Sequence, residues 1–315
     1  MRFLVLGAGG LGGYFGGSLL QGGADVSFLV RPRRAAQLAE RGLVIKEPAD
    51  EVAIPVRTVA AGAVDGPYDI VFLTCKAYDL DSATVAIAPA VGPRSAILPV
   101  LNGVNHIDRL AERLGAEHVL GGMILVRAEL APNGDIIRPS GLGGHEDVAF
   151  GELTGAPSAR CAAILDALAA AGLPGRISNN ILAEMWGKFC GFCCNASVST
   201  LTRAWAGEIA AAPAGAGFVK AAFDECARAT AAEGYPPSNS IRDLCLGMYS
   251  RPGLDYRPSI AADLEEGRAT EAEHTIGDLV RRAARHGLDV PILRAALCNL
   301  QIAEARRERS TRAAT

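Results

Sequence analysis

The sequence lacks a strong net charge, a long apolar run and a recognisable export signal. Its formal net charge is −3 at pH 7 over 315 residues, which gives no basis for electrostatic binding to nucleic acid or to an anionic membrane. No apolar stretch approaches the roughly 20 residues that a membrane-spanning helix needs. The first residues carry neither the apolar segment nor the cleavage site of a signal peptide. We therefore expect a cytoplasmic protein whose partner is a small molecule.

The eight cysteines lack the spacing of a structural metal site. Cys190 and Cys193 stand in a C-x-x-C arrangement, but no second pair of Cys or His follows at a similar spacing, as a zinc site would require. Disulfide frameworks are typical of short exported chains, and this chain is long. Cys190, Cys193 and Cys194 also fall within a predicted helix, where free cysteine behaves as a small hydrophobic residue. We expect buried thiols and no metal.

Length and local patterns predict two domains, because 315 residues exceed what one compact core usually holds. The first half alternates strand-like runs with helical patterns, which is typical of a parallel sheet covered by helices on both faces. We therefore expect an α/β fold with a Rossmann-type dinucleotide-binding domain in residues 1–178. The strand-like runs are residues 2–6, 24–30, 70–74 and 96–100, and the helical patterns are residues 13–21 and 34–41.

The composition changes near residue 178, after which Ala, Leu, Glu and Arg with helical periodicity dominate. Ser178 is a candidate N-cap for the first long helix. Residues 276–283 repeat apolar side chains with helical spacing, and Pro291 further on is a stop signal. The basic tail after Ala305 is expected to fray in solvent. Residues 179–315 are therefore predicted to form an all-helical substrate and catalytic domain. An apolar face of this half could also pack against a second copy of the chain to form a homodimer.

The first strand-like run is followed directly by a glycine-rich motif of the form G-x-G-x-x-G. In a strand–loop–helix setting the first glycine allows the tight turn and the second lets the backbone approach a pyrophosphate. The third lets the helix pack closely on the strand, and the helix N-terminus offers free N–H groups and the positive end of its dipole. The predicted dinucleotide-binding loop consists of Gly7, Ala8, Gly9, Gly10, Leu11 and Gly12.

The end of the second strand predicts which dinucleotide binds. An NAD site usually carries a carboxylate there, about 20 residues beyond the loop, to bind the ribose 2′-hydroxyl. Here the strand ends in Arg31-Pro32-Arg33-Arg34, and a guanidinium can grip a 2′-phosphate with forked, charge-assisted hydrogen bonds. We expect NADPH as the cofactor, with Arg31 nearest to the strand end. The alternative is a solvated basic turn.

Two further polar residues follow predicted strands at the edge where α/β sheets bind their ligands. Lys76 comes directly after the run 71–75, and Asn102 comes directly after the run 97–101. Either side chain could instead hydrogen-bond within its own loop. Their shared location favours membership of the cofactor site for both.

Two charged residues in the second half lie on apolar helix faces. Lys188 aligns with apolar side chains on the helical pattern of residues 178–194, and Glu271 does so on a helix expected to run on from Ser259. A buried ammonium is costly unless it is paired or functional, although a long lysine can also reach water. One inward lysine and one inward glutamate could share an interdomain cleft.

The whole chain resembles the ketopantoate reductase (2-dehydropantoate 2-reductase) family. The glycine loop is a general feature of dinucleotide-binding proteins, whereas the W-x-K-F, P-S and T-E pairs, in this order and with similar spacing, are more specific. The residues that carry the resemblance are the glycine loop, Val30-Arg31, Thr74-Cys75-Lys76-Ala77, Leu101-Asn102-Gly103, Trp186-Gly187-Lys188-Phe189, Pro258-Ser259, Thr270-Glu271 and Arg285-His286-Gly287 through Pro291.

The resemblance implies NADPH-dependent reduction of ketopantoate to pantoate, in pantothenate and coenzyme A synthesis. Lys188 would be the catalytic lysine, which polarises the keto oxygen and supplies the proton. Glu271 would be catalytic with it and would contact the substrate alcohol or the lysine. Ser259 would help to hold the substrate carboxylate, unless it only starts a helix. Asn102 would contact both the nicotinamide and the substrate, and Arg31 and Lys76 would hold the cofactor.

One departure from the family bears on the substrate. Well-studied members carry asparagines four and eight residues after the catalytic lysine, and here those positions are Phe192 and Ala196. Asn195 is out of phase with that helix face. A substrate hydroxyl without a partner would cost about 1–3 kcal/mol if buried. The pocket is therefore expected to be more apolar than in those members, and the sequence does not identify which keto acid is the substrate.

Two alternatives to a ketopantoate reductase remain from the sequence. One is a related NADP-dependent reductase of another small 2-keto acid. The other is a non-catalytic protein that binds NADPH as a sensor, because Rossmann domains also serve that role. The presence of both Lys188 and Glu271 favours an enzyme.

Overall fold

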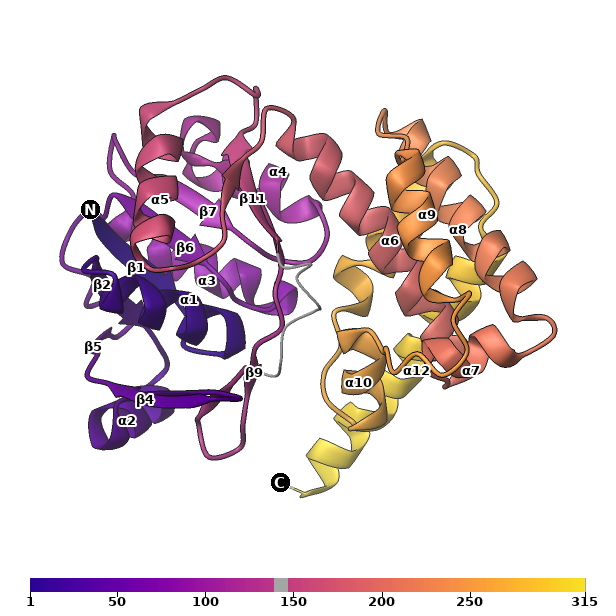
Figure 1. Cartoon of the computed structure of the whole chain (residues 1–315), viewed down its shortest axis with the longest axis horizontal. Helices are drawn as coiled ribbons and strands as arrows, with labels where there is room; N and C mark the ends of the chain where they lie inside the picture. Colours follow the sequence, from indigo (N-terminus) through magenta and orange to yellow (C-terminus); the bar gives the residue numbers. More distant parts are fainter. Residues whose placement is uncertain (139–146, 315) are drawn as a thin grey trace. The chain divides into compact units, whose positions relative to one another are not determined.

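The computed structural model describes residues 1–138 and 147–314 (Figure 1). The chain divides into two compact units, Met1–Leu182 and Ala183–Thr315. Ser178 still belongs to the first unit, because its amide hydrogen-bonds to the carbonyl of Phe150 at 2.8 Å, beside the last strand of that unit. The α/β fold class with a Rossmann-type first part and a helical second part is confirmed.

The first unit is built on a five-stranded parallel sheet with the strand order β5-β2-β1-β6-β7. The apolar runs that predicted its four longer strands are buried on both faces, as parallel strands between two helical layers must be. The strands are β1 (Arg2–Leu6), β2 (Asp25–Leu29), β5 (Arg57–Val59), β6 (Ile70–Leu73) and β7 (Ala96–Pro99), and the helices between them are α1 (Gly10–Gln21), α2 (Pro32–Arg41), η1 (Ala77–Asp79), α3 (Leu80–Ile87) and η2 (Ala88–Ala90).

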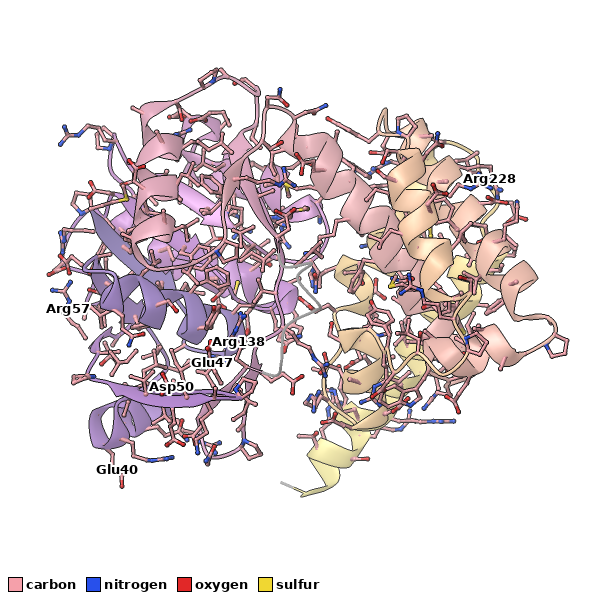
Figure 2. The ribbon with its side chains drawn as sticks, viewed as in Figure 1. Glu40, Glu47, Asp50, Arg57, Arg138 and Arg228 are labelled. Carbon is pink, nitrogen blue, oxygen red and sulfur yellow. The ribbon has the colours of Figure 1, made fainter. Side chains whose placement is uncertain are left out.

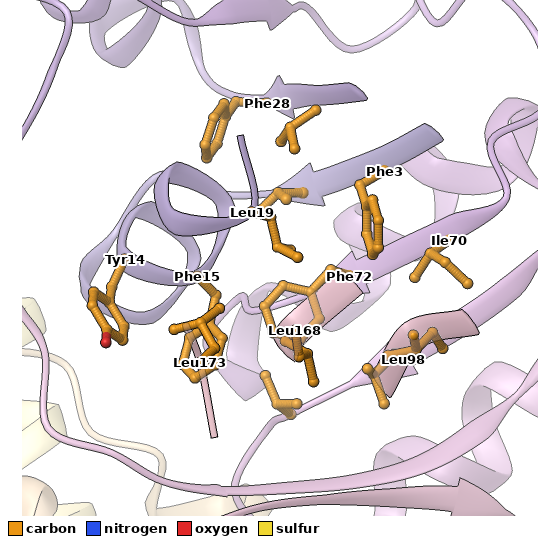
Figure 3. Close-up of a cluster of buried hydrophobic side chains, with 14 of the residues drawn as sticks. Phe3, Tyr14, Phe15, Leu19, Phe28, Ile70, Phe72, Leu98, Leu168 and Leu173 are labelled. Carbon is orange, nitrogen blue, oxygen red and sulfur yellow. The ribbon is translucent and has the colours of Figure 1, made fainter. Parts of the chain in front are cut away.

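One face of this sheet packs on α1 and on α5 (Ala159–Ala170) through alternate strand residues. Phe3 and Phe72 point into a core that also contains Phe15 of α1 and Leu168 of α5 (Figure 3). The rings of Phe15 and Phe72 lie 5.8 Å apart between centroids. Because successive side chains of a strand alternate between faces, this contact fixes α1 against the sheet and thereby places the start of α1 at the end of β1.

Two smaller sheets complete the first unit, and the sequence pattern did not predict them. A four-stranded sheet has the order β4-β3-β10-β9, and a three-stranded sheet has the order β12-β11-β8. Several of these strands have only two residues, too few to show a periodicity. Their bounds are β3 (Leu43–Glu47), β4 (Asp50–Ile54), β8 (Leu120–Leu125), β9 (Glu129–Leu130), β10 (Ile136–Ile137), β11 (Asp147–Glu152) and β12 (Arg176–Ile177), and the helices α4 (Asn105–Leu114) and η3 (Ala116–His118) precede β8.

All the regular secondary structure in the described residues of the second unit is helical. Ile276, Leu279 and Ala283 of α11 are buried, as their spacing predicted. None of the helices in the described part of the chain is long and apolar enough to span a membrane. The helices are α6 (Ile181–Thr202), α7 (Ala206–Ala211), α8 (Gly215–Ala232), α9 (Asn239–Met248), α10 (Ser259–Glu265), η4 (Ala272–His274), α11 (Ile276–Arg285) and α12 (Pro291–Ala314).

The C-terminal segment differs from its prediction. Pro291 does not only stop α11, because it is also the first residue of α12, where a proline loses no helical hydrogen bond. The buried carboxylate of Glu225 accepts hydrogen bonds from the amides of Ile292 and Leu293, both at 3.1 Å. The tail after Ala305, expected to fray, continues α12 to Ala314. A capped helix start and Arg307, which hydrogen-bonds to Glu304 at 2.9 Å, support this extension.

Five of the six cysteines in the helical unit are buried, as expected for thiols that act as small hydrophobic side chains. Cys190, Cys193 and Cys194 lie inside α6 with 0% exposure. Burial raises the pKa of the Cys190 thiol to about 12. The expectation of buried thiols fails for Cys298, which is exposed, and for Cys75, which is partly exposed.

Candidate functional site

The glycine loop has the geometry of a tight turn between β1 and α1. Gly7 has φ +94°, in the region that favours glycine, and its amide hydrogen-bonds to the carbonyl of Leu29 at 3.0 Å. Gly9 is the N-cap of α1, and a Cβ atom added to it would meet no atom within 4 Å. A Cβ at Gly12 would lie 2.2 Å from the carbonyl oxygen of Gly7. The loop thus leaves open space at Gly9 and none at Gly12.

The other loop residues are held by their surroundings. Ala8 is buried, and its carbonyl accepts a hydrogen bond from Nε of Arg34 at 3.0 Å. A Cβ at Gly10 would lie 2.1 Å from the carbonyl oxygen of Ala128. Leu11 packs against the hydrophobic core. The first N–H groups of α1, which have no partner within the helix itself, can therefore face a ligand from a fixed backbone.

Arg31 is the N-cap residue of α2, directly after the end of β2. Its Nη2 lies 2.7 Å from Oδ1 of Asp79, and its side chain is 78% exposed. Asp79 follows β6, and β1 lies between β2 and β6 in the sheet. The pair therefore spans the end of β1, where the glycine loop begins. An exposed ion pair of this kind contributes little to stability, so the guanidinium can exchange its partner for a ligand at low cost.

Lys76 and Asn102 lie on the same edge of the sheet as the glycine loop. Lys76 follows β6 and is exposed, and Asn102 follows β7 and is partly exposed. Carboxyl ends of parallel strands meet at one edge, which is where open α/β sheets bind ligands. Asn102 is followed by Gly103 with φ +87°, a turn that ends the strand run sharply. The first unit thus brings the glycine loop, Arg31, Lys76 and Asn102 to one edge.

Lys188 and Glu271 lie close enough in the second unit for their charges to interact. Lys188 is on α6, in line with the buried side chains of Ile181 and Met185. The residue as a whole is partly exposed, yet burial of the ammonium lowers the pKa of Lys188 to about 8, and the negative charge of Glu271 partly offsets this by raising it. The ammonium can thus lose its proton near neutral pH.

The route by which Glu271 reaches this place differs from the prediction. It was expected on a helix continuing from Ser259, but α10 ends at Glu265 and Gly267 has φ +66°. Glu271 instead precedes η4 and is 5% exposed. The helical face through Gly267 is therefore wrong, because a left-handed glycine breaks the helix there. Ser259 is the first residue of α10 and is exposed.

Three residues near these groups were assigned no role from the sequence. Arg34 contacts the glycine loop, as described, and belonged to a recognised basic run. Thr74 donates a hydrogen bond from Oγ1 to the carbonyl of Leu6 at 2.9 Å. Trp186 stacks on Tyr235 with ring centroids 5.2 Å apart. The guanidinium of Arg282 lies 4.9 Å from the centre of the same Trp186 ring. The only sequence signal for this stacked group was the large ring of Trp186, two positions before Lys188.

Two family models match the chain over most of its length. The model described as ketopantoate reductase PanE/ApbA matches residues 3–155, and the model of the C terminal part of the same family matches residues 180–304. Together they cover both units. Members of this family use a nicotinamide dinucleotide cofactor.

Individual relatives agree with the family models. The chain is 33% identical over 305 residues to an uncharacterized oxidoreductase, YkpB, of Bacillus subtilis, covering 97% of this chain and 99% of the relative. A crystal structure of 2-dehydropantoate 2-reductase from Geobacter metallireducens is 25% identical, with a TM-score of 0.86 over 96% of this chain and 100% of the other. A ternary structure of D-mandelate dehydrogenase with NADH and anilino(oxo)acetate is 23% identical, with a TM-score of 0.86 over 98% and 100% of the two chains. The last likeness concerns the fold.

Proposed function

Because the chain belongs to the ketopantoate reductase family, we propose that this oxidoreductase reduces a small 2-keto acid with NADPH, and that ketopantoate is the substrate. The observation that carries the proposal is the desolvated ammonium of Lys188 beside Glu271. The pKa of Lys188, about 8, suits proton transfer near neutral pH. We assign residues 1–178 to cofactor binding and residues 179–315 to substrate binding and catalysis.

The cofactor site is proposed at the edge of the parallel sheet. The loop Gly7–Gly12 would hold the pyrophosphate with the free amides at the start of α1. The 2′-phosphate would replace Asp79 as the partner of the Arg31 guanidinium. Lys76 would add a second positive charge, and Asn102 would orient the nicotinamide. When bound, NADPH supplies the hydride.

The chain's own contribution to the chemistry is proposed for Lys188 and Glu271. The Lys188 ammonium donates a hydrogen bond to the keto oxygen and passes its proton from Nζ as negative charge develops there. Glu271 stabilises the charged form of the lysine before the transfer, since its negative charge raises the pKa of Lys188. Asn102 and Ser259 are proposed to contact the substrate, and the Ser259 hydroxyl would bind the substrate carboxylate.

The residues that follow Lys188 on α6 favour an alternative substrate, a keto acid other than ketopantoate. Ala196 is fully buried and Phe192 is partly buried, so neither offers a hydrogen-bond donor. The amide of Asn195 is already engaged, because its Oδ1 accepts a bond from Sγ of Cys245 at 3.3 Å and its side chain bonds to Tyr256. A keto acid with an apolar side chain is therefore the alternative substrate, and the D-mandelate dehydrogenase structure also holds an aryl compound, anilino(oxo)acetate.

The experiment that tests the proposal is NADPH consumption with matched keto acids. Ketopantoate and 3,3-dimethyl-2-oxobutanoate differ only by a hydroxyl group, and phenylglyoxylate tests the aryl alternative. Higher kcat/KM for ketopantoate than for both others supports the proposed substrate. Preference for either apolar compound replaces ketopantoate but keeps the reductase. Tight NADPH binding without turnover of any keto acid would favour a non-catalytic sensor.

The pKa of Lys188 predicts how the rate depends on pH. The pKa is lowered below the ordinary lysine value to about 8, so the ammonium needed as a general acid is present below pH 8 and is lost above it. We expect kcat/KM for reduction to fall about tenfold per pH unit above pH 8, and the reverse oxidation to rise up to that pH. Because Glu271 raises this pKa, Glu271→Gln should move the inflection to lower pH. A profile that is flat from pH 7 to 10 would exclude Lys188 as the acid.

Arg31 is expected to distinguish the two cofactors. Arg31→Ala should weaken NADPH binding about 10- to 100-fold, which corresponds to the loss of hydrogen bonds to a charged group, and should leave NADH binding unchanged. The measurement is titration calorimetry with both cofactors. Arg57→Ala is the matched control, because Arg57 (Figure 2) is a half-exposed arginine that pairs with Asp25 at the opposite end of β2. Equal losses for NADPH and NADH would remove Arg31 from the 2′-phosphate site.

A further inference from the structure

A short hairpin packs on the first turn of α1, next to the glycine loop. It is formed by residues 129–137, with β9 antiparallel to β10, and we refer to it as the β9–β10 hairpin. A Cβ at Gly10 would lie 2.1 Å from the carbonyl oxygen of Ala128, just before the hairpin. A Cβ at Gly13 would lie 2.7 Å from Cδ1 of Ile136, within it. Glycines in α1 thus allow the hairpin to approach the helix backbone directly.

One guanidinium joins this hairpin to the glycine loop. Nε of Arg34 donates to the carbonyl of Ala8 at 3.0 Å, and Nη1 donates to the carbonyl of Gly134 at 2.8 Å. Nη2 is buried and makes no hydrogen bond within residues 1–138 and 147–314. Burial lowers the pKa of Arg34, although the charge of Asp135 partly opposes this. A partly buried guanidinium with an unused donor costs free energy. We therefore expect Arg34 to have a role beyond stabilising the fold.

The hairpin is anchored without Arg34. The buried carboxylate of Asp135 lies 3.2 Å from Arg41 and 3.1 Å from Lys46. Burial opposes its ionisation, but the hydrogen bonds from Lys46 and Asn133 prevail and lower the pKa of Asp135. Arg41 also donates to the carbonyl of Asn133 at 3.2 Å. What Arg34 adds is therefore the bond to Ala8 and not the position of the hairpin.

The far end of the hairpin is fixed in the same way. Arg138, directly after β10, places Nε 3.2 Å from Oε1 of Glu47, and both side chains are visible together in Figure 2. Its guanidinium also lies 4.3 Å from the centre of the Tyr14 ring on α1. The hairpin is therefore attached to α1, α2 and β3, and it gives Arg34 a fixed partner at Gly134.

The bond to Ala8 determines the direction of an amide that faces the ligand. The peptide between Ala8 and Gly9 is planar and trans, so its C=O and N–H point in opposite directions. With the oxygen held toward Arg34, the N–H of Gly9 is turned to the opposite side, at the residue where a Cβ would meet only open space. Loop amides of this kind bind phosphate groups.

We propose that Arg34 is a positioning residue for the cofactor: through Ala8 it holds the Gly9 amide in the orientation that binds the dinucleotide pyrophosphate. This rests on the proposed function, because it takes the glycine loop as the cofactor site. The pyrophosphate is common to NADPH and NADH, so Arg34 acts on both cofactors. Arg31, in contrast, acts on the 2′-phosphate that only NADPH carries.

The test compares Arg34→Ala and Arg34→Lys with Arg41→Ala as the matched control. Arg41→Ala removes two anchors of the hairpin but leaves the bond to Ala8 in place. Titration calorimetry gives Kd for each cofactor, thermal unfolding gives Tm, and steady-state rates give kcat and the cofactor KM. We expect Arg34→Ala to raise Kd and KM about tenfold for both cofactors and to leave kcat at saturation unchanged. Arg34→Lys should recover most of the loss, and Arg41→Ala should lower Tm while Kd stays within about twofold.

Each other outcome overturns the proposal in a recognisable way. A loss limited to NADPH would make Arg34 a 2′-phosphate ligand. A lower kcat with unchanged Kd and KM would show only a smaller folded fraction. An equal rise in Kd for Arg41→Ala would assign the effect to the hairpin as a whole. Wild-type protein that binds neither cofactor would refute the proposed function itself, whereas tight wild-type binding that Arg34→Ala leaves intact would refute only the role of Arg34.

Discussion

Replacement of Lys188 by alanine is expected to lower kcat about a thousandfold while leaving the Kd of NADPH unchanged. General acid catalysis is typically worth 10²- to 10⁴-fold in rate, and a thousandfold corresponds to about 4 kcal/mol of transition-state stabilisation. The ammonium of Lys188 is the desolvated cation whose pKa is lowered to about 8, so water cannot replace it well. The measurement is the steady-state rate with the best keto acid, together with calorimetric titration of NADPH.

Lys220→Ala is the control for this variant. Lys220 is exposed on α8 and pairs with Asp224 at 2.5 Å, in an i,i+4 arrangement of little energetic value. Its replacement should change kcat by less than about twofold. Substantial activity in Lys188→Ala, for instance a tenth of the wild-type rate, would show that another group supplies the proton. A parallel loss of NADPH affinity would show that Lys188 serves the cofactor instead.

Gly12→Ala is expected to weaken cofactor binding strongly and to lower stability. The added Cβ would lie 2.2 Å from the carbonyl oxygen of Gly7 and 2.4 Å from Oγ1 of Thr74. Both neighbours are fixed, because Thr74 is bonded to Leu6 and Gly7 to Leu29. Overpacking of this kind costs about 1–3 kcal/mol or more, which predicts a Tm lower by about 5 °C or more. The displaced loop should bind NADPH about 100-fold more weakly.

Gly9→Ala separates the two effects. A Cβ at this position meets no atom within 4 Å, so the variant should unfold at the wild-type temperature. Its methyl group would nevertheless occupy the space through which a pyrophosphate approaches, and we expect NADPH binding to weaken about tenfold. The measurements are thermal unfolding and calorimetric titration for both variants. Unchanged binding in Gly9→Ala would mean that the open space at this residue is not where the cofactor binds.

The parallel sheet could be predicted from the sequence because its signal is local. Strands buried on both faces are continuous apolar runs, such as residues 2–6 and 70–74. The β9–β10 hairpin could not be predicted in this way. Its strands have two residues each, and its position depends on contacts from Arg41 and Lys46, far away in sequence. Such contacts leave no periodic pattern.

The candidate site shows the same limit. Polar residues at strand ends, such as Lys76 and Asn102, could be placed on one edge because the topology of parallel strands requires it. The neighbourhood of Lys188 and Glu271 was anticipated, but from a helix that ends before Glu271. A left-handed turn at Gly267 redirects the chain there. A single glycine in an alanine- and glutamate-rich segment does not by itself indicate whether a helix continues or stops.

The distribution of the thiols has a practical consequence for spectroscopy. Six of the eight cysteines are buried, Cys75 is partly exposed and Cys298 on α12 is exposed. Burial raises the pKa of Cys193 and Cys226 well above the ordinary value, and a neutral, enclosed thiol reacts slowly with maleimides. A fluorophore or spin label therefore attaches first to Cys298 in the native enzyme, without any engineered cysteine. After Cys75 and Cys161 of the first unit are replaced by serine, the appearance of further reactive thiols becomes a direct optical measure of the opening of the helical unit.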